Sequence, residues 1–206
     1  TVHIKSDAID VNMGCPLPFS VQGGMGSALL RDRERVKQVI SALVRNVNKQ
    51  ITCKIRIFPD IRETIDLVKT IEMEGASAVA VHGGASPPFS PFSFFVFFFV
   101  YLHNEFINCI YYTHSLIPER DKHKAHWDAI KAVQDAMPHF PIIANGDVLK
   151  HEDIARIKEE TGCSSVMIAR GALWNCSVFS PIQEPNTVVA QKYVENVRYF
   201  LSWPLN

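Results

Sequence analysis

A cysteine that directly follows a predicted strand is the first candidate for chemistry in this sequence. Cys15 stands in the run Asn12-Met13-Gly14-Cys15-Pro16, after a short β-type segment at residues 8–12. A cysteine at an arbitrary position is usually a small, buried, apolar packing residue. In α/β barrels, however, the residues that do chemistry lie at the carboxyl ends of the strands. We therefore expect a chemical role for Cys15.

Two cations share one face of another predicted strand. Side chains alternate along the segment ITCKIRI at residues 51–57, so Lys54 and Arg56 lie on one face and apolar side chains on the other. Two cations on an otherwise apolar strand need anions, and in a barrel this face points inward, toward a site at the mouth. The alternative is an edge strand with hydrated charges, which the helical pattern that follows disfavours.

Three further strand ends carry polar or glycine-rich sequence. His82 ends the segment 78–82, where we expect it to contact a cofactor or substrate, although a lone histidine can also be a cap or a core residue. The turns Asn145-Gly146-Asp147 and Ala169-Arg170-Gly171 end the last two strands. Glycines let backbone N–H groups approach an anion, and Arg170 adds a full charge. Barrel enzymes hold phosphate in the loops after strands 7 and 8, so the two turns predict such a cradle.

The elements that must position these residues alternate between strand and helix, which predicts an α/β fold with a parallel sheet. The expected strands lie at 8–12, 51–57, 78–82, 141–145 and 164–169, and the clearest helices at 33–46, 124–136 and 152–161. A complete (β/α)₈ barrel needs about 250 residues. We therefore expect a partial (β/α)₈ TIM barrel, with strands 4 to 8 present, strands 1 to 3 missing and the start of a C-terminal helical domain.

One segment interrupts this pattern. Eight of the 13 phenylalanines lie between Phe89 and Phe106, in the longest gap between predicted strands. The unbroken apolar run Phe94–Leu102 is shorter than the roughly 20 residues of a membrane-spanning helix. We interpret 85–118 as a foreign insert from mis-splicing or translated non-coding sequence, with a lineage-specific loop and a membrane anchor as alternatives. The predicted parts are then 1–84 and 119–180 for the barrel and 181–206 for a truncated helical domain.

Composition restricts the possible partners. The 21 basic and 21 acidic residues balance, so the chain has no overall cationic footprint for nucleic acid. Five cysteines without paired spacing favour a reducing compartment over a disulfide framework. The first ten residues do not form a signal peptide, and Thr1 resembles a cut edge. We expect a cytoplasmic monomer without a metal site or membrane contact.

Several motifs in this order resemble the tRNA-dihydrouridine synthases, and most of all the eukaryotic cytosolic branch that modifies the D-loop, the tRNA-dihydrouridine(20) synthases. The matching stretches are DVNMGCPLPFSVQGGMGSALL, TCKIRI, AVAVHG, PIIANGDV and SSVMIARGALWN. NMGCP together with GGMG is highly specific, whereas the two glycine turns occur in other flavin barrels. The resemblance implies an FMN-binding (β/α)₈ barrel followed by a small helical domain, with tRNA as substrate and NADPH as reductant.

The resemblance also implies a role for each candidate residue. Hydride from reduced FMN would reach C6 of a flipped-out uracil, and Cys15 would protonate C5 from the opposite face as general acid. Asn12 would hold the uracil, and Arg56 would serve flavin or RNA phosphate. Lys54 and His82 would contact the flavin. Its phosphate would lie in the cradle formed by Asn145, Gly146, Asp147, Ala169, Arg170 and Gly171.

Two departures from the family pattern leave alternatives open. The family reads HGR where this chain has His82-Gly83-Gly84, and the family's first three strands have no counterpart after Thr1. The chain could therefore be an inactive fragment or a mispredicted gene product of such an enzyme, because a barrel without these strands has open edges. A flavin barrel that acts on a small molecule such as dihydroorotate would explain the phosphate turns but not NMGCP with GGMG.

Overall fold

Five parallel strands form the centre of this computed structural model, which describes residues 6–15, 18–84, 95–96, 99–102, 105–107, 113–114 and 124–201. The strands lie side by side in their order along the chain, and each hydrogen-bonds to the next of the five. These strands are β1 (Ala8–Asn12), β2 (Gln50–Arg56), β3 (Ala78–His82), β8 (Ile142–Asn145) and β9 (Ser165–Ile168). The predicted α/β fold with a parallel sheet is thus confirmed.

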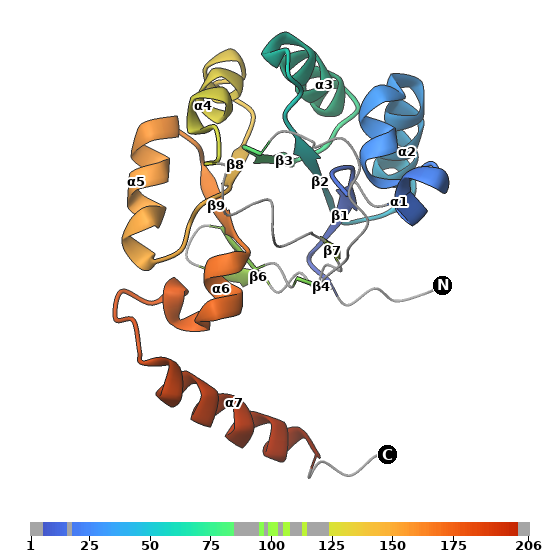
Figure 1. Cartoon of the computed structure of the whole chain (residues 1–206). Helices are drawn as coiled ribbons and strands as arrows, with labels where there is room; N and C mark the ends of the chain where they lie inside the picture. Colours follow the sequence, from blue (N-terminus) through green and yellow to red (C-terminus); the bar gives the residue numbers. More distant parts are fainter. Residues whose placement is uncertain are drawn as a thin grey trace.

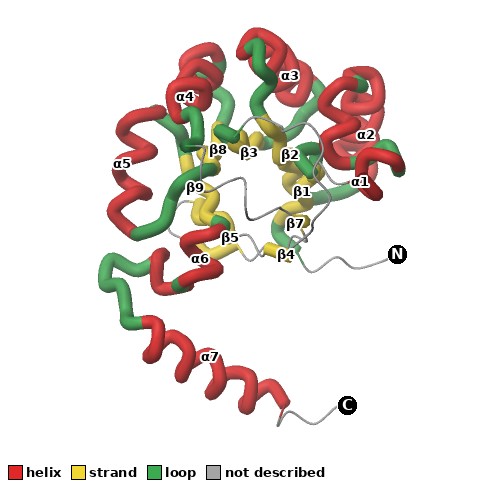
Figure 2. Tube along the Cα trace, in the orientation of Figure 1, coloured by secondary structure: helices red, strands yellow, loops and turns green. Residues whose placement is uncertain are grey.

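Four helices follow the strands and lie around the outer side of the sheet, so that the strands form an inner arc (Figures 1 and 2). They are α2 (Arg33–Asn46), α3 (Ile61–Met73), α4 (Trp127–Ala136) and α5 (His151–Thr161). The Asp32 side chain caps α2 by accepting a hydrogen bond from the Arg35 amide at 3.0 Å. Gly75 follows α3 with a φ of 92°, a conformation that suits glycine after a helix. This arrangement is consistent with a partial (β/α)₈ barrel.

The strands β2, β3, β8 and β9 are largely buried on both faces of the sheet. The outer residues of β2, Ile51, Cys53 and Ile55, are fully buried beneath the helices. A smaller inner cluster contains Ala78 and Ala80 of β3, Ile143 of β8 and Met167 of β9. Lys54 pairs in register with Ala80, and it is 7% exposed, whereas Arg56 is 5% exposed. The two cations therefore lie on the inner face, as alternation along the strand predicts.

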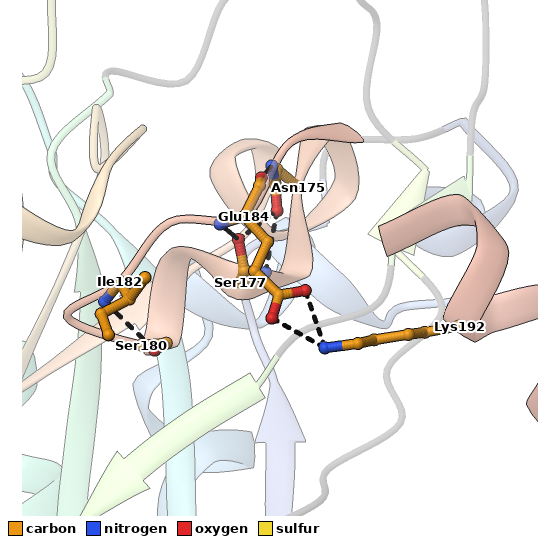
Figure 3. Close-up of polar contacts among 6 residues, drawn as sticks. All are labelled: Asn175, Ser177, Ser180, Ile182, Glu184 and Lys192. Carbon is orange, nitrogen blue, oxygen red and sulfur yellow. Dashed lines mark hydrogen bonds and ion pairs between the residues drawn. The ribbon is translucent and has the colours of Figure 1, made fainter. Parts of the chain in front are cut away.

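Shorter elements complete the described chain: α1 (Pro18–Gln22), the 3₁₀ helix η1 (Gly26–Arg31), α6 (Arg170–Trp174) and the 3₁₀ helix η3 (Cys176–Phe179). A last helix, α7 (Asn186–Leu201), extends away from the sheet (Figure 1). Polar contacts around Asn175 join η3 to the chain that leads into α7 (Figure 3). The range 181–206, where the sequence predicts the start of a helical domain, contains the helix α7.

Most of the segment 85–118 lies outside the described residues. Its described parts are the strands β4 (Phe95–Val96), β5 (Phe99–Leu102), β6 (Glu105–Ile107) and β7 (Thr113–His114). A foreign insert is expected to be unpacked or to project from the barrel, but β5 does neither. β5 pairs antiparallel with β9, and β6 pairs antiparallel with β5. The pairing satisfies backbone groups that β9 would otherwise present at a sheet edge.

Candidate active site

Strand register places five of the predicted site residues in two neighbouring rows on the inner face. One row crosses β1, β2 and β3 through Asn12, Lys54 and Ala80. The next row, toward the carboxyl ends, crosses β2, β3 and β8 through Arg56, His82 and Asn145. In-register residues on adjacent strands lie on the same side of the sheet. The structure therefore brings two buried cations, a histidine and two amides to one surface.

Cys15 lies at the end of β1, above these rows, in a loop held by hydrogen bonds. The Asn12 side-chain oxygen accepts from the Gly14 amide at 3.0 Å and from the Cys15 amide at 3.2 Å. The Arg56 Nε donates to the Gly14 carbonyl at 2.8 Å. Cys15 is 8% exposed. Asn12 and Arg56 thus contact the cysteine loop itself. From the sequence we expected these two residues to contact substrate or flavin, and we did not predict their contact with this loop.

A glycine loop forms the other side of the cysteine. The Ser27 amide, at the start of η1, donates to the Cys15 carbonyl at 2.8 Å. Gly26 is buried there with a φ of 57°. Sequence reasoning noted GGMG as a family motif and missed this contact. The repeated glycines of GGMG could have indicated this contact, because glycine permits a close approach between two backbone segments.

The two glycine turns meet at the ends of β8 and β9. Arg170 Nη2 and Asp147 Oδ1 form an ion pair at 2.5 Å, and the other Asp147 oxygen accepts from the Ala125 amide at 2.6 Å. Asp147 has a φ of 55°, in the left-handed region. Trp127 Nε1 donates to the Gly146 carbonyl at 3.1 Å, a support that the sequence did not predict. The predicted cradle residues are therefore adjacent, with Asp147 oriented by Arg170 at the start of α6 and by the Ala125 amide in the loop before α4.

The contacts of His82 define its tautomer. Its Nδ1 accepts a hydrogen bond from the Gly84 amide at 2.7 Å, so in the neutral ring the proton is on Nε2. A Cβ at Gly84 would stand 2.6 Å from His82 Cε1. Gly84, at the position where the family pattern has arginine, therefore lies close to His82. A larger residue at this position would displace the imidazole ring.

A carboxyl group lies one layer deeper than the cations. Asp10 of β1 pairs with Thr52 of β2, whose hydroxyl donates to Asp10 Oδ1 at 2.7 Å. Asp10 Oδ2 is buried and has no hydrogen-bond partner among the described residues. Burial raises the pKa of Asp10 above its ordinary value, although the Thr52 hydrogen bond and the Lys54 charge act in the opposite direction. Burial also raises the pKa of the Cys53 thiol on the outer face, and Asp10 adds to this.

The buried cations of the inner face suit a ligand that is anionic. The same ligand should also carry hydrogen-bond donors, because a buried acceptor lies on this face. Asn145 Nδ2 donates to the Met167 carbonyl at 2.8 Å, but the buried Asn145 Oδ1 has no partner among the described residues. A buried acceptor without a donor is costly, so this oxygen is suited to accept a hydrogen bond from a bound group. Within the described part of the chain, no cluster of three metal-ligating side chains is present. No described helix is long and apolar enough to cross a membrane.

Comparison with known proteins identifies the family. The family model for dihydrouridine synthase (Dus) matches residues 1–201. The tRNA-dihydrouridine(16/17) synthase [NAD(P)(+)] of Saccharomyces cerevisiae is 30% identical over 90% of this chain and 37% of its own length. The Schizosaccharomyces pombe enzyme of the same name is 31% identical over 87% of this chain and 38% of its own length. This chain thus spans less than two-fifths of the length of these two relatives.

A human relative named tRNA-dihydrouridine(20a/20b) synthase [NAD(P)+]-like is 27% identical over 87% of this chain and 47% of its own length. Among solved structures, a dihydrodipicolinate synthase from Agrobacterium tumefaciens covers 77% of this chain and 41% of its own, with a TM-score of 0.43 and 13% identity. That structural likeness is too weak to support an argument. The family model covers nearly the whole chain, and the chain therefore belongs to the dihydrouridine synthase family.

Proposed function

We propose that this chain is the barrel part of an FMN-dependent tRNA-dihydrouridine synthase, which reduces a uridine of the tRNA D-loop to 5,6-dihydrouridine with NADPH as reductant. The observation that carries the proposal is the position of Cys15 beside the inner rows that contain Lys54, Arg56, His82 and Asn145. The names of the relatives, which specify tRNA, dihydrouridine and NAD(P), support the same reaction.

The inner face fits FMN on three counts. Asn145 Oδ1 has no donor among the residues that the structure describes, and a flavin ring or its ribityl chain can supply one. The buried ammonium of Lys54 suits the electron-rich edge of a reduced flavin, and His82 presents Nε2–H nearby in the next row. The cradle of Gly146, Asp147, Arg170 and Gly171 suits the phosphate, because Arg170 carries a full positive charge there, which its ion pair with Asp147 offsets in part. Ala169 supplies backbone to this cradle.

When bound, FMN supplies the hydride that C6 of the uracil accepts. The chain's own residues then have to place a proton at C5 on the opposite face. Cys15 is the proposed donor, because a positioned thiol can act as a general acid and Cys15 is held at the end of β1 beside the inner rows. Asn12 and Arg56 lie beside it, and we assign them to the uracil and to flavin or RNA phosphate respectively.

The five parallel strands correspond in this proposal to barrel strands 4 to 8, and α7 to the start of the helical domain. We assign residues 1–84 and 119–180 to the barrel, 85–118 to an insert and 181–206 to the helical domain. The partner is tRNA, the compartment is the cytoplasm and the state is monomeric. The GGMG motif, which contacts the Cys15 loop, favours this family chemistry over a flavin barrel for a small molecule.

The test uses the full-length protein and unmodified tRNA. We expect purified protein to be yellow, to release FMN on denaturation and to form dihydrouridine when NADPH is added, detected by the mass gain of digested nucleosides. Fully modified tRNA is the control and should show no further gain. A well-folded, colourless protein that ignores added FMN would overturn the proposal. So would a flavoprotein that oxidises NADPH yet leaves every uridine unreduced.

A further inference from the structure

The glycine motif GGMG, residues 23–26, has no role in the proposed chemistry, yet it lies against the candidate acid. A Cβ placed on Gly26 would stand 2.5 Å from the Cys15 carbonyl oxygen, 2.6 Å from Ser20 Oγ and 3.0 Å from Cys15 Cβ. The nearest of these atoms is backbone and cannot turn away as a flexible side chain would. Only glycine therefore permits the Cys15 loop to occupy this position.

The opposite side of the loop is held by Asn12. Its side-chain oxygen accepts from two successive amides, Gly14 and Cys15, which is the geometry of an Asx-turn. Arg56 Nε adds a charge-assisted bond to the Gly14 carbonyl, and the Ser27 amide binds the Cys15 carbonyl. Four hydrogen bonds from three separate elements thus converge on two residues.

We propose that Asn12 and Gly26 are positioning residues that hold Cys15 in one pose before any substrate arrives, Asn12 through its acceptor oxygen and Gly26 by leaving room for the Cys15 carbonyl. This inference rests on the proposed function, in which Cys15 gives its proton to C5 of uracil. Proton transfer requires the donor within hydrogen-bond reach of its target, so a loop fixed in advance removes a conformational search. Asn12 Oδ1 already accepts two hydrogen bonds from the loop. Any hydrogen bond from Asn12 to uracil must therefore come from Nδ2.

The experiment measures how fast iodoacetamide modifies each cysteine of the full-length protein, with peptide mass spectrometry to separate them. Cys53 and Cys163 are buried, and burial raises the pKa of both thiols, so they report global unfolding. Cys176 is exposed and reports the intrinsic rate. For Gly26→Ala and Asn12→Ala we expect Cys15 alone to react about tenfold faster, the change that follows from the loss of a loop-fixing hydrogen bond.

Two matched variants sharpen the result. Gly24 has a similar positive φ, 68°, but a Cβ there would first meet the Arg35 guanidinium, the flexible end of a side chain. Gly24→Ala therefore carries the same backbone strain without a contact to Cys15 and should leave Cys15 protected. Asn12→Asp keeps the acceptor and loses the amide donor, so it should also protect Cys15, once rates are compared at full thiol ionisation.

Activity separates positioning from substrate contact. With pre-reduced enzyme, Gly26→Ala, which removes no substrate contact, should lower the single-turnover rate at saturating tRNA and leave the dissociation constant for tRNA unchanged. Unchanged Cys15 reactivity in both Asn12→Ala and Gly26→Ala would overturn the inference. Equal acceleration of Cys15, Cys53 and Cys163 in both variants would also overturn it, because it would show a role in global stability alone. If the wild-type enzyme formed no dihydrouridine, the proposed function would fail, while the alkylation contrast would still decide the positioning role.

Discussion

Single residues on the inner face show how much the site depends on buried charge. Lys54 and Arg56 are almost fully buried, and a buried cation is tolerated only where hydrogen bonds or counter-charges replace its hydration. Arg56 meets part of this requirement through the Gly14 carbonyl. The cost of burial is the reason to regard these two cations as functional, because an apolar strand would pack the same sheet with less penalty.

We expect Cys15→Ala in the full-length enzyme to keep FMN binding and flavin reduction by NADPH. Dihydrouridine formation should slow by a factor of about 10²–10⁴, the usual range for a lost general acid. Single-turnover reduction of unmodified tRNA by pre-reduced enzyme measures this rate, and Cys176→Ala, at an exposed position, is the control. An unchanged rate would remove Cys15 from the mechanism, whereas lost flavin and a lower melting temperature would indicate a packing role.

Asp10→Asn tests the buried carboxyl group. Because the folded-state pKa of Asp10 is raised, the folded protein retains this proton at pH values where the unfolded chain has released it. The contribution of Asp10 to stability therefore falls as pH rises from the ordinary carboxyl pKa of 3.8 through the raised value, and it is constant above that. Asparagine does not titrate and can still accept the Thr52 hydrogen bond.

The free energy of unfolding of wild type minus that of Asp10→Asn should accordingly decrease across this window. Denaturant titrations of both proteins at a series of pH values measure the difference. A difference that increased with pH would contradict the prediction, and it would show that attraction to Lys54 outweighs the cost of burying the carboxylate.

At the scale of elements, polar side chains rather than apolar contacts fix the start of α7. Asn175 is 8% exposed and uses both ends of its side chain: Oδ1 accepts from the Ser177 amide at 3.0 Å, and Nδ2 donates to the Glu184 carbonyl at 2.7 Å (Figure 3). Lys192 of α7 donates to the Glu184 carboxylate at 2.7 Å. By contrast, Tyr193 and Val194 of α7 are exposed. The direction of α7 therefore depends on this small network.

We expect Asn175→Ala to destabilise the junction by about 2 kcal/mol, because it removes a 3₁₀-helix cap and leaves several polar partners unpaired. The Ser177 amide should lose protection from hydrogen exchange, and so should the Glu184 amide, because it donates to the Ser177 hydroxyl that Asn175 Oδ1 holds in place. The strands should keep their protection. Ser180→Ala is the control, since Ser180 accepts only an exposed hydrogen bond from the Ile182 amide among the described contacts. Equal protection at Ser177 and Glu184 in the Asn175 variant and wild type would contradict the assignment.

At the scale of the whole molecule, the described sheet ends at β1 on one side and at β6 on the other. A closed barrel has no such edges, and an edge strand offers unpaired backbone groups to other chains. Large apolar side chains are also exposed outside the sheet, notably Leu173, Trp174 and Ile182. The isolated chain therefore has features that favour self-association.

We expect residues 1–206, expressed alone, to aggregate and to hold no flavin, whereas the full-length protein stays soluble and yellow. Size-exclusion chromatography with light scattering and flavin absorbance measure both properties. A monodisperse monomer of the isolated chain with a cooperative melting transition would contradict this expectation. It would also argue against the interpretation of the chain as an inactive fragment.

The sequence by itself determined the elements and the face on which the cations lie. Apolar periodicity located the strands and helices, because burial of one side is a local pattern, and alternation along β2 placed Lys54 and Arg56 together. Gly146 of the turn after β8 was likewise readable, because its φ of 137° favours glycine.

Only the tertiary structure decided which partners these residues meet. Asp147 binds Arg170, Arg56 reaches the Gly14 carbonyl, Gly26 lies against Cys15 and β5 pairs with β9. Each contact joins residues from different elements, and its geometry depends on how the strands align and how the loops cross their ends. A local pattern contains no information about that alignment, so these contacts became visible only when the sheet was assembled.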